Sequence, residues 1–269
     1  MKSRFIIILL ACIYCGRDFA AELATSLAAP PGAVRAAPCE GVYPLHLQGV
    51  TTDRRSAIFW IWTDVLVKTD LQGRLMKRVA ADNHQGDPCF HDGKVFVAVN
   101  LGKFNELPGQ EDSWVYAYDA VTLELLARHP VPELVHGAGG IARHDGKFIV
   151  VGGLPPGVAE NYLYEYDEAF KFRKRHVLAS GHTDKGIQTA TWANGSWWFG
   201  CYGNPKVLLR ADENFNFTGR WEFDASLGLE AWPDGTFLIG RNTRDSSGHT
   251  GRIVIAREHP LEGLISKRP

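Results

Sequence analysis

Residues 139–146 read Gly139-Gly140-Ile141-Ala142-Arg143-His144-Asp145-Gly146, and four related stretches occur elsewhere in the chain. The related stretches are residues 49–56, 86–93, 188–195 and 228–235. Each predicts a turn followed by an apolar strand, and these strands are expected at Ile58–Trp62, Val95–Val99, Phe148–Val151, Trp197–Phe199 and Phe237–Ile239. A pattern that returns at a nearly fixed spacing predicts a repeat architecture.

A second landmark supports the same spacing. The strand after each apolar strand ends on an acidic residue, and these acids lie 45–49 residues apart: Asp70, Asp119, Asp167, Asp212 and Glu258. A further alternating strand follows in the first four units, at Arg74–Ala80, Leu123–His129, Lys171–Val177 and Asn216–Phe223. Four short strands per unit at this period are typical of propeller blades.

The sequence therefore predicts an all-β fold, a five-bladed β-propeller of four-stranded antiparallel blades. The last unit lacks an obvious outer strand after Glu258, and we expect residues Glu40–His46 to supply it and close the ring. An open sandwich or a six-bladed ring is the alternative. One propeller would occupy residues 40–269 as a single domain and as a monomer.

Composition narrows the class of function. The formal net charge is −1, and lysine and arginine are scattered rather than gathered in the basic stripe that nucleic acid requires. No run beyond the N-terminal segment is long enough to span a bilayer. We therefore expect no nucleic-acid partner and no transmembrane segment in the mature chain.

Residues 1–24 are typical of a signal peptide, because a basic start is followed by the apolar run Phe5–Ile13 and by small residues. Residues 25–39 are predicted to be a flexible lead. The protein is then secreted or periplasmic, with lipid anchoring at Cys12 as an alternative. The mature cysteines are Cys39, Cys89 and Cys201, and the sequence leaves open a Cys39–Cys89 disulfide or three buried free thiols.

Histidines precede four of the repeated stretches: His46, His84, His136 and His182. Equivalent positions of a propeller converge near its axis, and imidazole is the commonest metal ligand. These four residues, with Gln188 as the alternative to His182, are predicted to bind a divalent ion (Mn, Zn, Fe or Ca). The alternative is a structural ring of histidines that hydrogen-bond neighbouring blades. The last repeat has no histidine, and Asp224 and Glu230 are its polar candidates.

Long polar loops are expected on the same face, at Asn100–Asp112, Gly152–Asn161 and Arg241–Gly251. Lys103, Tyr202 and Arg241 are the predicted catalytic residues, with an imidazole not bound to metal, Lys103 or Tyr202 as general acid or base. Cations, amides and aromatic rings together suit a hydroxylated, anionic small molecule or oligosaccharide.

The blade pattern resembles secreted bacterial propeller proteins with NHL- and YncE-like repeats, over roughly residues 40–260. Residues 46–50, His46-Leu47-Gln48-Gly49-Val50, are similar in their Gln-Gly pair to the blade start of plant-type glutaminyl cyclases. Histidines and a glutamine on a propeller axis also resemble the manganese site of oligogalacturonate lyases, in constellation alone. That resemblance implies a metal bound by His46, His84, His136 and Gln188.

Three functions remain open at this stage. The leading one is a secreted metal-dependent lyase or hydrolase for uronate-type or oxidised sugars, with the metal as Lewis acid. The second is a non-catalytic propeller that binds a glycan or protein. The third is a glutaminyl-cyclase-like acyltransferase that uses an axial carboxylate such as Glu230.

Overall fold

The structure is a computed structural model that describes residues 36–266. Within that range the chain is all-β, and no helix there is long and apolar enough to cross a membrane. The predicted signal peptide, residues 1–24, and the alternative lipid anchor at Cys12 lie outside the described residues. Strand β1 (Ala37–Tyr43) begins inside the segment predicted to be a flexible lead.

Most strands form four-stranded antiparallel meanders in which each strand pairs with the next. The first meander contains β2 (Leu47–Thr52), β3 (Ala57–Trp62), β4 (Val65–Asp70) and β5 (Leu75–Ala80). The second contains β6 (Gln85–His91), β7 (Lys94–Asn100), β8 (Ser113–Asp119) and β9 (Leu125–Pro130). The third contains β10 (Ala138–His144), β11 (Lys147–Gly152), β12 (Asn161–Asp167) and β13 (Phe172–Leu178). The fourth contains β14 (Ile187–Ala193), β15 (Ser196–Cys201), β16 (Val207–Ala211) and β17 (Phe217–Glu222).

The last sheet takes strands from both ends of the described chain. It contains β18 (Leu229–Ala231), β19 (Phe237–Asp245), β20 (Gly248–His259), β21 (Gly263–Ser266) and β1. Along one edge of β20, β1 pairs with residues 249–253 and β21 pairs with residues 256–259. The N-terminal segment therefore adds an outer strand, slightly earlier in the chain than the predicted Glu40–His46.

Two features of this sheet differ from the sequence prediction. The segment Arg241–Gly251 is not a loop, because β19 and β20 pair along it as far as Asp245 and Gly248. Its polar residues form a hairpin whose outer side is covered by β1. Strand β21 was not predicted, because it is only four residues long and follows Pro260 closely.

The repeated turns have the geometry that their sequence predicts. Both central residues have positive φ in three of them: Asp92 and Gly93 (47° and 69°), Asp145 and Gly146 (47° and 69°), and Asn194 and Gly195 (51° and 75°). Two successive positive φ angles define the type I′ turn, whose twist matches that of the strands it joins. The turns therefore fix the register of the first two strands in these meanders.

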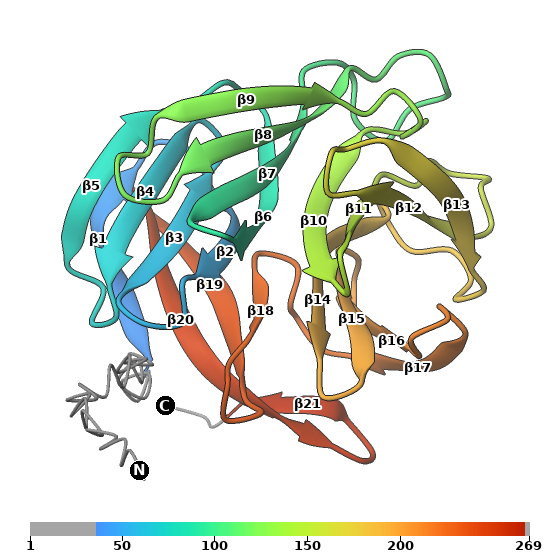
Figure 1. Cartoon of the computed structure of the whole chain (residues 1–269). Coiled ribbons are helices and arrows are strands. Elements are labelled where there is room, and N and C mark those ends of the chain that lie inside the picture. The colour runs from blue at the N-terminus through green and yellow to red at the C-terminus, as the bar shows by residue number, and fades with distance from the viewer. Residues whose placement is uncertain (1–35, 267–269) are drawn as a thin grey trace, which may run out of the picture. The chain divides into compact units, whose positions relative to one another are not determined.

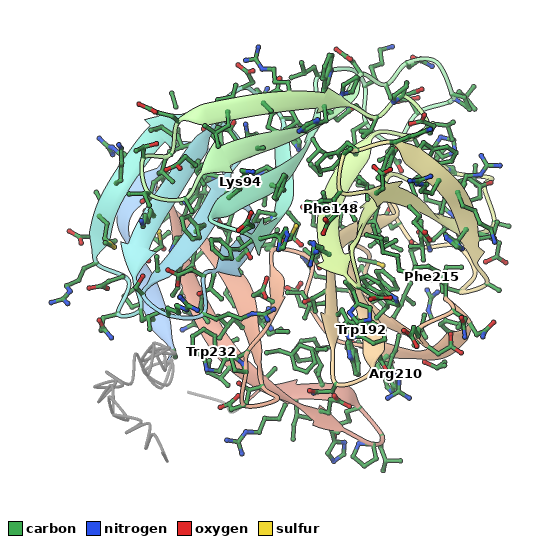
Figure 2. The ribbon with its side chains drawn as sticks, viewed as in Figure 1. Lys94, Phe148, Trp192, Arg210, Phe215 and Trp232 are labelled. Atoms are coloured by element: carbon green, nitrogen blue, oxygen red, sulfur yellow. The ribbon has the colours of Figure 1, made fainter. Side chains whose placement is uncertain are left out.

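The core lies between neighbouring sheets rather than within one layer. One cluster joins Phe59 of β3 to Val97 of β7, and another joins Trp62 of β3 to Leu238 of β19. Similar clusters lie between the remaining neighbours, and Figure 2 shows Phe148 and Phe215 among these side chains. Figure 1 shows β2, β6, β10, β14 and β18 nearest the common centre. The first strands of the repeats therefore lie close to one another.

Candidate functional site

Close approach of the first strands places one carboxylate at the centre. A Cβ atom on Gly49 would lie 2.4 Å from Oδ1 of Asp87, and one on Gly140 would lie 3.2 Å from the Cβ of Asp87. Only glycine fits at these two positions. The Oδ2 atom of Asp87 accepts a hydrogen bond from the amide of Ala190 at 3.2 Å, whereas Oδ1 has no partner among residues 36–266. Burial, with a smaller contribution from Glu230, raises the pKa of Asp87 well above its ordinary value.

Glu230 is the second buried carboxylate, and residues of the first repeat bind its side chain. Its Oε2 accepts a hydrogen bond from Thr51 at 2.8 Å, and its Oε1 lies 3.0 Å from Nη2 of Arg54. Burial raises the pKa of Glu230, and the Arg54 charge opposes the shift. Both oxygens of this carboxylate therefore have partners within the protein.

Three imidazoles form a group that we call the histidine cluster: His46, His84 and His249. The rings of His46 and His249 have centroids 6.3 Å apart. Burial lowers the pKa of His46, and the charges of His84 and His249 lower it further. Burial also lowers the pKa of His84, so both rings are neutral at pH 7.

Hydrogen bonds orient two members of this cluster. Gln48 directs its side-chain Nε2 at Nε2 of His84 over 2.9 Å, and the same nitrogen donates to the Thr63 hydroxyl at 3.2 Å. If the amide nitrogen donates, the His84 proton resides on Nδ1. His249 contacts the side chain of Asn242 through Nδ1 at 3.0 Å, and Asn242 also accepts from the amide of Leu47. Strand β19 is thereby tied to β2 beside the cluster.

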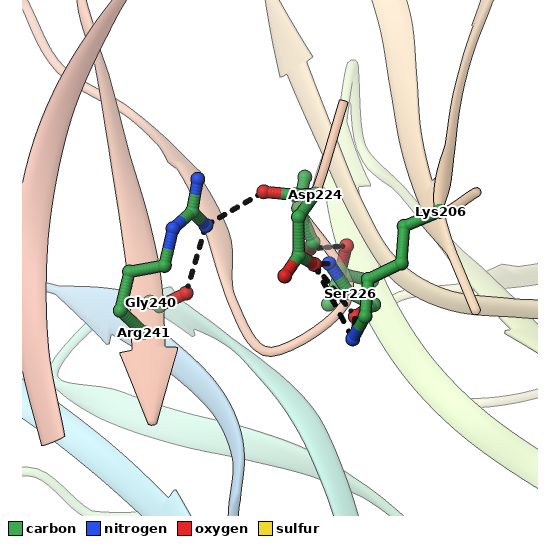
Figure 3. A network of polar contacts seen from close by, with 7 residues as sticks. Lys206, Asp224, Ser226, Gly240 and Arg241 are labelled. Atoms are coloured by element: carbon green, nitrogen blue, oxygen red, sulfur yellow. Dashed lines mark hydrogen bonds and ion pairs between the residues drawn. The ribbon is translucent and has the colours of Figure 1, made fainter. Parts of the chain in front are cut away.

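A lysine and an arginine share one network of polar contacts. Lys206 donates to the Ser226 hydroxyl at 2.9 Å and lies 3.6 Å from the Asp224 carboxylate. Arg241 donates through Nη1 to the carbonyl oxygens of Asp224 at 2.6 Å and of Gly240 at 3.1 Å. Figure 3 shows this network, in which Asp224 connects the lysine to the arginine. Arg241 directly precedes Asn242, whose side chain contacts His249, so the network lies next to the histidine cluster along β19.

Arg241 retains unused donors. Its guanidinium is half-buried, and burial lowers its pKa. It makes no ion pair and no hydrogen bond through Nε or Nη2 within residues 36–266, and its guanidinium carbon lies 5.6 Å from the ring centroid of Phe223. A guanidinium with two free donors presents the fork that binds a carboxylate in bidentate fashion.

Tyr202 lies under two lysines at the edge of the same network. The Nζ atom of Lys206 is 5.0 Å from the ring centroid, and that of Lys185 is 5.9 Å from it. Burial raises the pKa of Tyr202 to about 12, so its hydroxyl is protonated at neutral pH. Tyr202 and Arg241, two of the predicted catalytic residues, are therefore joined through Lys206 and Asp224.

The other predicted site residues make contacts elsewhere. His136 is buried, bonds the Glu106 carbonyl through Nδ1 at 2.8 Å and stacks on Tyr162. His182 is exposed and bonds the Val158 carbonyl. Gln188 donates to the Lys185 carbonyl, and Lys103 donates to Gln110 on an exposed loop. Two of the four predicted histidine ligands, His46 and His84, thus share the candidate site, and two bond loop carbonyls.

No group of three or more His, Cys, Asp or Glu side chains is placed to hold a metal ion in the described part of the chain. The metal therefore stays a prediction. Cys39, Cys89 and Cys201 are free and buried, so the Cys39–Cys89 disulfide is not formed.

Comparisons with known proteins support the fold alone. The chain is similar to the crystal structure of glutaminyl cyclase from Myxococcus xanthus, with 11% identity, a TM-score of 0.58, and coverage of 82% of this chain and 94% of that one. It is also similar to the WD40 β-propeller domain of Doa1, with 10% identity, a TM-score of 0.46, and coverage of 82% and 69%. No family model and no curated protein matches. The predicted propeller-like, all-β fold is confirmed.

Several residues of the site were not predicted. His249 and Asn242 lie on the β19–β20 hairpin and have no equivalent in the other repeats, so the repeat pattern gave no signal for them. Asp87 stands in the first strand of its repeat, at a position where the other copies have no charged residue, and this break in the pattern was a usable signal. Lys185 lies in the longer loop before β14, which does not align with the other repeats, so the repeat pattern gave no signal for it.

Proposed function

We propose that this chain is a closed, five-bladed propeller whose histidine-bearing face binds an acidic, hydroxylated small molecule, such as a uronic acid or a short oligosaccharide that contains one. The blades would be the four meanders and the sheet of β18–β21 with β1. Closure is supported by the pairing of β1 with β20 and by the apolar cluster between the last sheet and the first.

The half-buried Arg241 carries the proposal. Its Nη1 atom donates to two backbone carbonyls, and its Nε and Nη2 atoms are free to bind a carboxylate in bidentate fashion. Lys206 and Lys185 add positive charge nearby, and Asp224 is the carboxylate that offsets it. Three cationic side chains thus face one carboxylate, and the negative charge of a ligand carboxylate would be attracted to this site.

Neutral imidazoles and amides suit the rest of such a ligand. With the Gln48 amide donating to its Nε2, His84 would present Nδ1–H, and His46 presents a ring without a hydrogen-bond partner in the described chain. Such groups donate to and accept from hydroxyls without adding a fixed charge. The arrangement favours a sugar acid over an inorganic anion.

Calorimetric titration with galacturonate, and with galactose as its neutral counterpart, tests the proposal. We expect the acid to bind and galactose to bind at least about tenfold more weakly. Arg241→Lys keeps the charge and removes the fork, so it should weaken galacturonate binding by about tenfold or more. Arg244→Lys, on the exposed part of the same hairpin, is the matched control. Equal binding of both sugars, or an Arg241→Lys variant that binds like the wild type, would contradict the proposal.

A second candidate is the metal-dependent lyase or hydrolase predicted from the sequence. The pair His46 and His249 supports it, because their ring centroids lie 6.3 Å apart and catalytic metal sites use few protein ligands and keep a position open. These two imidazoles, with water or the ligand carboxylate, would complete the coordination. Elemental analysis of the purified protein, repeated on His46→Gln, tests this: stoichiometric metal that the substitution removes supports it, and wild-type protein free of metal after incubation with Mn²⁺ and Zn²⁺ opposes it.

The acyltransferase alternative has less support. It needs an axial carboxylate free to exchange protons with substrate, and both oxygens of Glu230 are already bonded to Thr51 and Arg54. The fold similarity to a glutaminyl cyclase does not bear on this activity at 11% identity.

A further inference from the structure

A notch of about 450 Å³ lies beside the proposed acid-binding site. Its lining includes Asp184, Tyr202, Asn204, Arg220 and Glu222. The volume falls within the range of small-molecule sites. Tyr202 belongs both to this notch and to the Lys206–Asp224–Arg241 network, so the two sites are adjacent.

The polar side chains of the notch have few partners in the protein. Arg220 is occupied, since its guanidinium donates to the carbonyls of Ser180 and His182. The side chains of Asp184, Tyr202, Asn204 and Glu222 make no hydrogen bond and no ion pair among residues 36–266. Asp184, Asn204 and Glu222 are exposed and Tyr202 is half-buried, so their polar atoms are accessible to a ligand that enters the notch.

The charges decide which ligand chemistry fits. Two carboxylates and an amide oxygen accept hydrogen bonds, and a ligand rich in donors would satisfy them. An ammonium group would supply such donors, but Arg220 lines the same notch and Lys185 and Lys206 lie against Tyr202. Those three cations disfavour a further positive charge and leave neutral hydroxyls as the better match.

We propose that this notch is a second subsite, which binds a neutral sugar residue linked to the acidic one held at Arg241. The proposal rests on the proposed function and extends it, since it makes the preferred ligand a disaccharide or longer. The acid unit would lie between Arg241 and the histidine cluster. The neutral unit would lie beyond Tyr202, with its hydroxyls on Asp184 and Glu222.

The test compares two ligands by calorimetry: a free uronic acid and an aldobiouronic acid, in which a uronic acid is linked to a neutral sugar. For the wild type we expect the disaccharide to bind at least about tenfold more tightly than the free acid. Glu222→Gln and Asp184→Asn are isosteric, and each should reduce this ratio of affinities by about threefold or more. Glu213→Gln, on the turn at the opposite end of the same meander, should leave the ratio unchanged.

The outcomes distinguish failure of the subsite from failure of the proposed function. A wild-type ratio near one, with the free acid still bound, overturns the subsite and leaves the proposed function intact. Failure of both acids to bind overturns the proposed function and the subsite with it. Tighter binding of a uronic acid linked to an amino sugar than of the neutral-sugar disaccharide overturns the assignment of hydroxyl chemistry. A variant that keeps the full ratio although circular dichroism shows a native fold removes that residue from the subsite.

Discussion

Asp87 and Ala190 are joined by a hydrogen bond across the centre of the molecule, from the amide of Ala190 to the carboxylate of Asp87 at 3.2 Å. Asp87 lies on β6 and Ala190 on β14, so the bond links two meanders that are not consecutive in the chain. The side chain fits because its neighbours Gly49 and Gly140 have no Cβ. It is a fully buried acid with one oxygen unpaired in the described structure, and its pKa is raised.

Asp87→Asn should therefore change how stability depends on pH. A raised pKa in the folded state means that this carboxyl contributes stability fully below its unfolded pKa near 3.8, and that the contribution is lost as pH rises through the folded value. The slope is at most about 1.4 kcal/mol per pH unit for one proton. Relative to wild type, the asparagine variant should gain stability between pH 5 and pH 8, as measured by urea denaturation. Asp92→Asn, at an exposed turn position whose side chain makes no hydrogen bond within residues 36–266, is the control. A difference between Asp87→Asn and wild type that does not change with pH would contradict the prediction.

Arg54→Ala should destabilise the fold although Arg54 is half exposed. The substitution removes the cation from Glu230, whose side chain is only 8% exposed, and leaves Thr51 as the remaining side-chain partner. A buried carboxylate that loses a charged partner costs about 1–3 kcal/mol of unfolding free energy. Adding Glu230→Gln should recover part of the loss in urea denaturation. Arg55→Ala removes an exposed neighbour whose side chain makes no hydrogen bond or ion pair within residues 36–266, and it should have little effect. A loss equal to that of Arg54→Ala would argue against the ion pair.

The sequence predicted more of this fold than of its site, and particular residues show why. Turns such as Asp145-Gly146 need two positive φ angles, and few residue pairs supply them, so the turn sequence locates the flanking strands. A histidine in a loop carries no such constraint. His46 and His84 lie in one cluster, whereas His136 bonds the carbonyl of Glu106 instead. Glu106 belongs to a loop whose conformation cannot be predicted from the repeat pattern. His249 reaches the cluster from a hairpin that has no counterpart in the other repeats.

The three cysteines should be unreactive in the folded protein. Burial raises the pKa of Cys39 and of Cys201 to about 12 and that of Cys89 well above its ordinary value, so the thiolate fraction is negligible at pH 8. For a chain that begins at residue 36, a colorimetric thiol reagent should label none of them under native conditions and all three after unfolding in urea. Labelling of only one thiol after unfolding would show a disulfide, and rapid native labelling would show that a buried site opens.

Removal of residues 36–43 should cause a large loss of stability and aggregation. Strand β1 covers residues 249–253 of β20, so its removal exposes a row of unpaired backbone groups that other chains can join. It also removes Tyr43, which stacks on Trp62 with ring centroids 4.0 Å apart, and Cys39 from the same apolar cluster. The deletion ends before His46, so the candidate site keeps its histidines. Thermal melting and size-exclusion chromatography, against a chain that begins at residue 36, measure the effect.

Tyr43→Ala in the full strand separates the two causes: it should lower the melting temperature while the protein stays monomeric, because the edge of β20 remains paired. A shortened chain that melts like its parent and elutes as a monomer would rule out β1 as the strand that completes the last sheet.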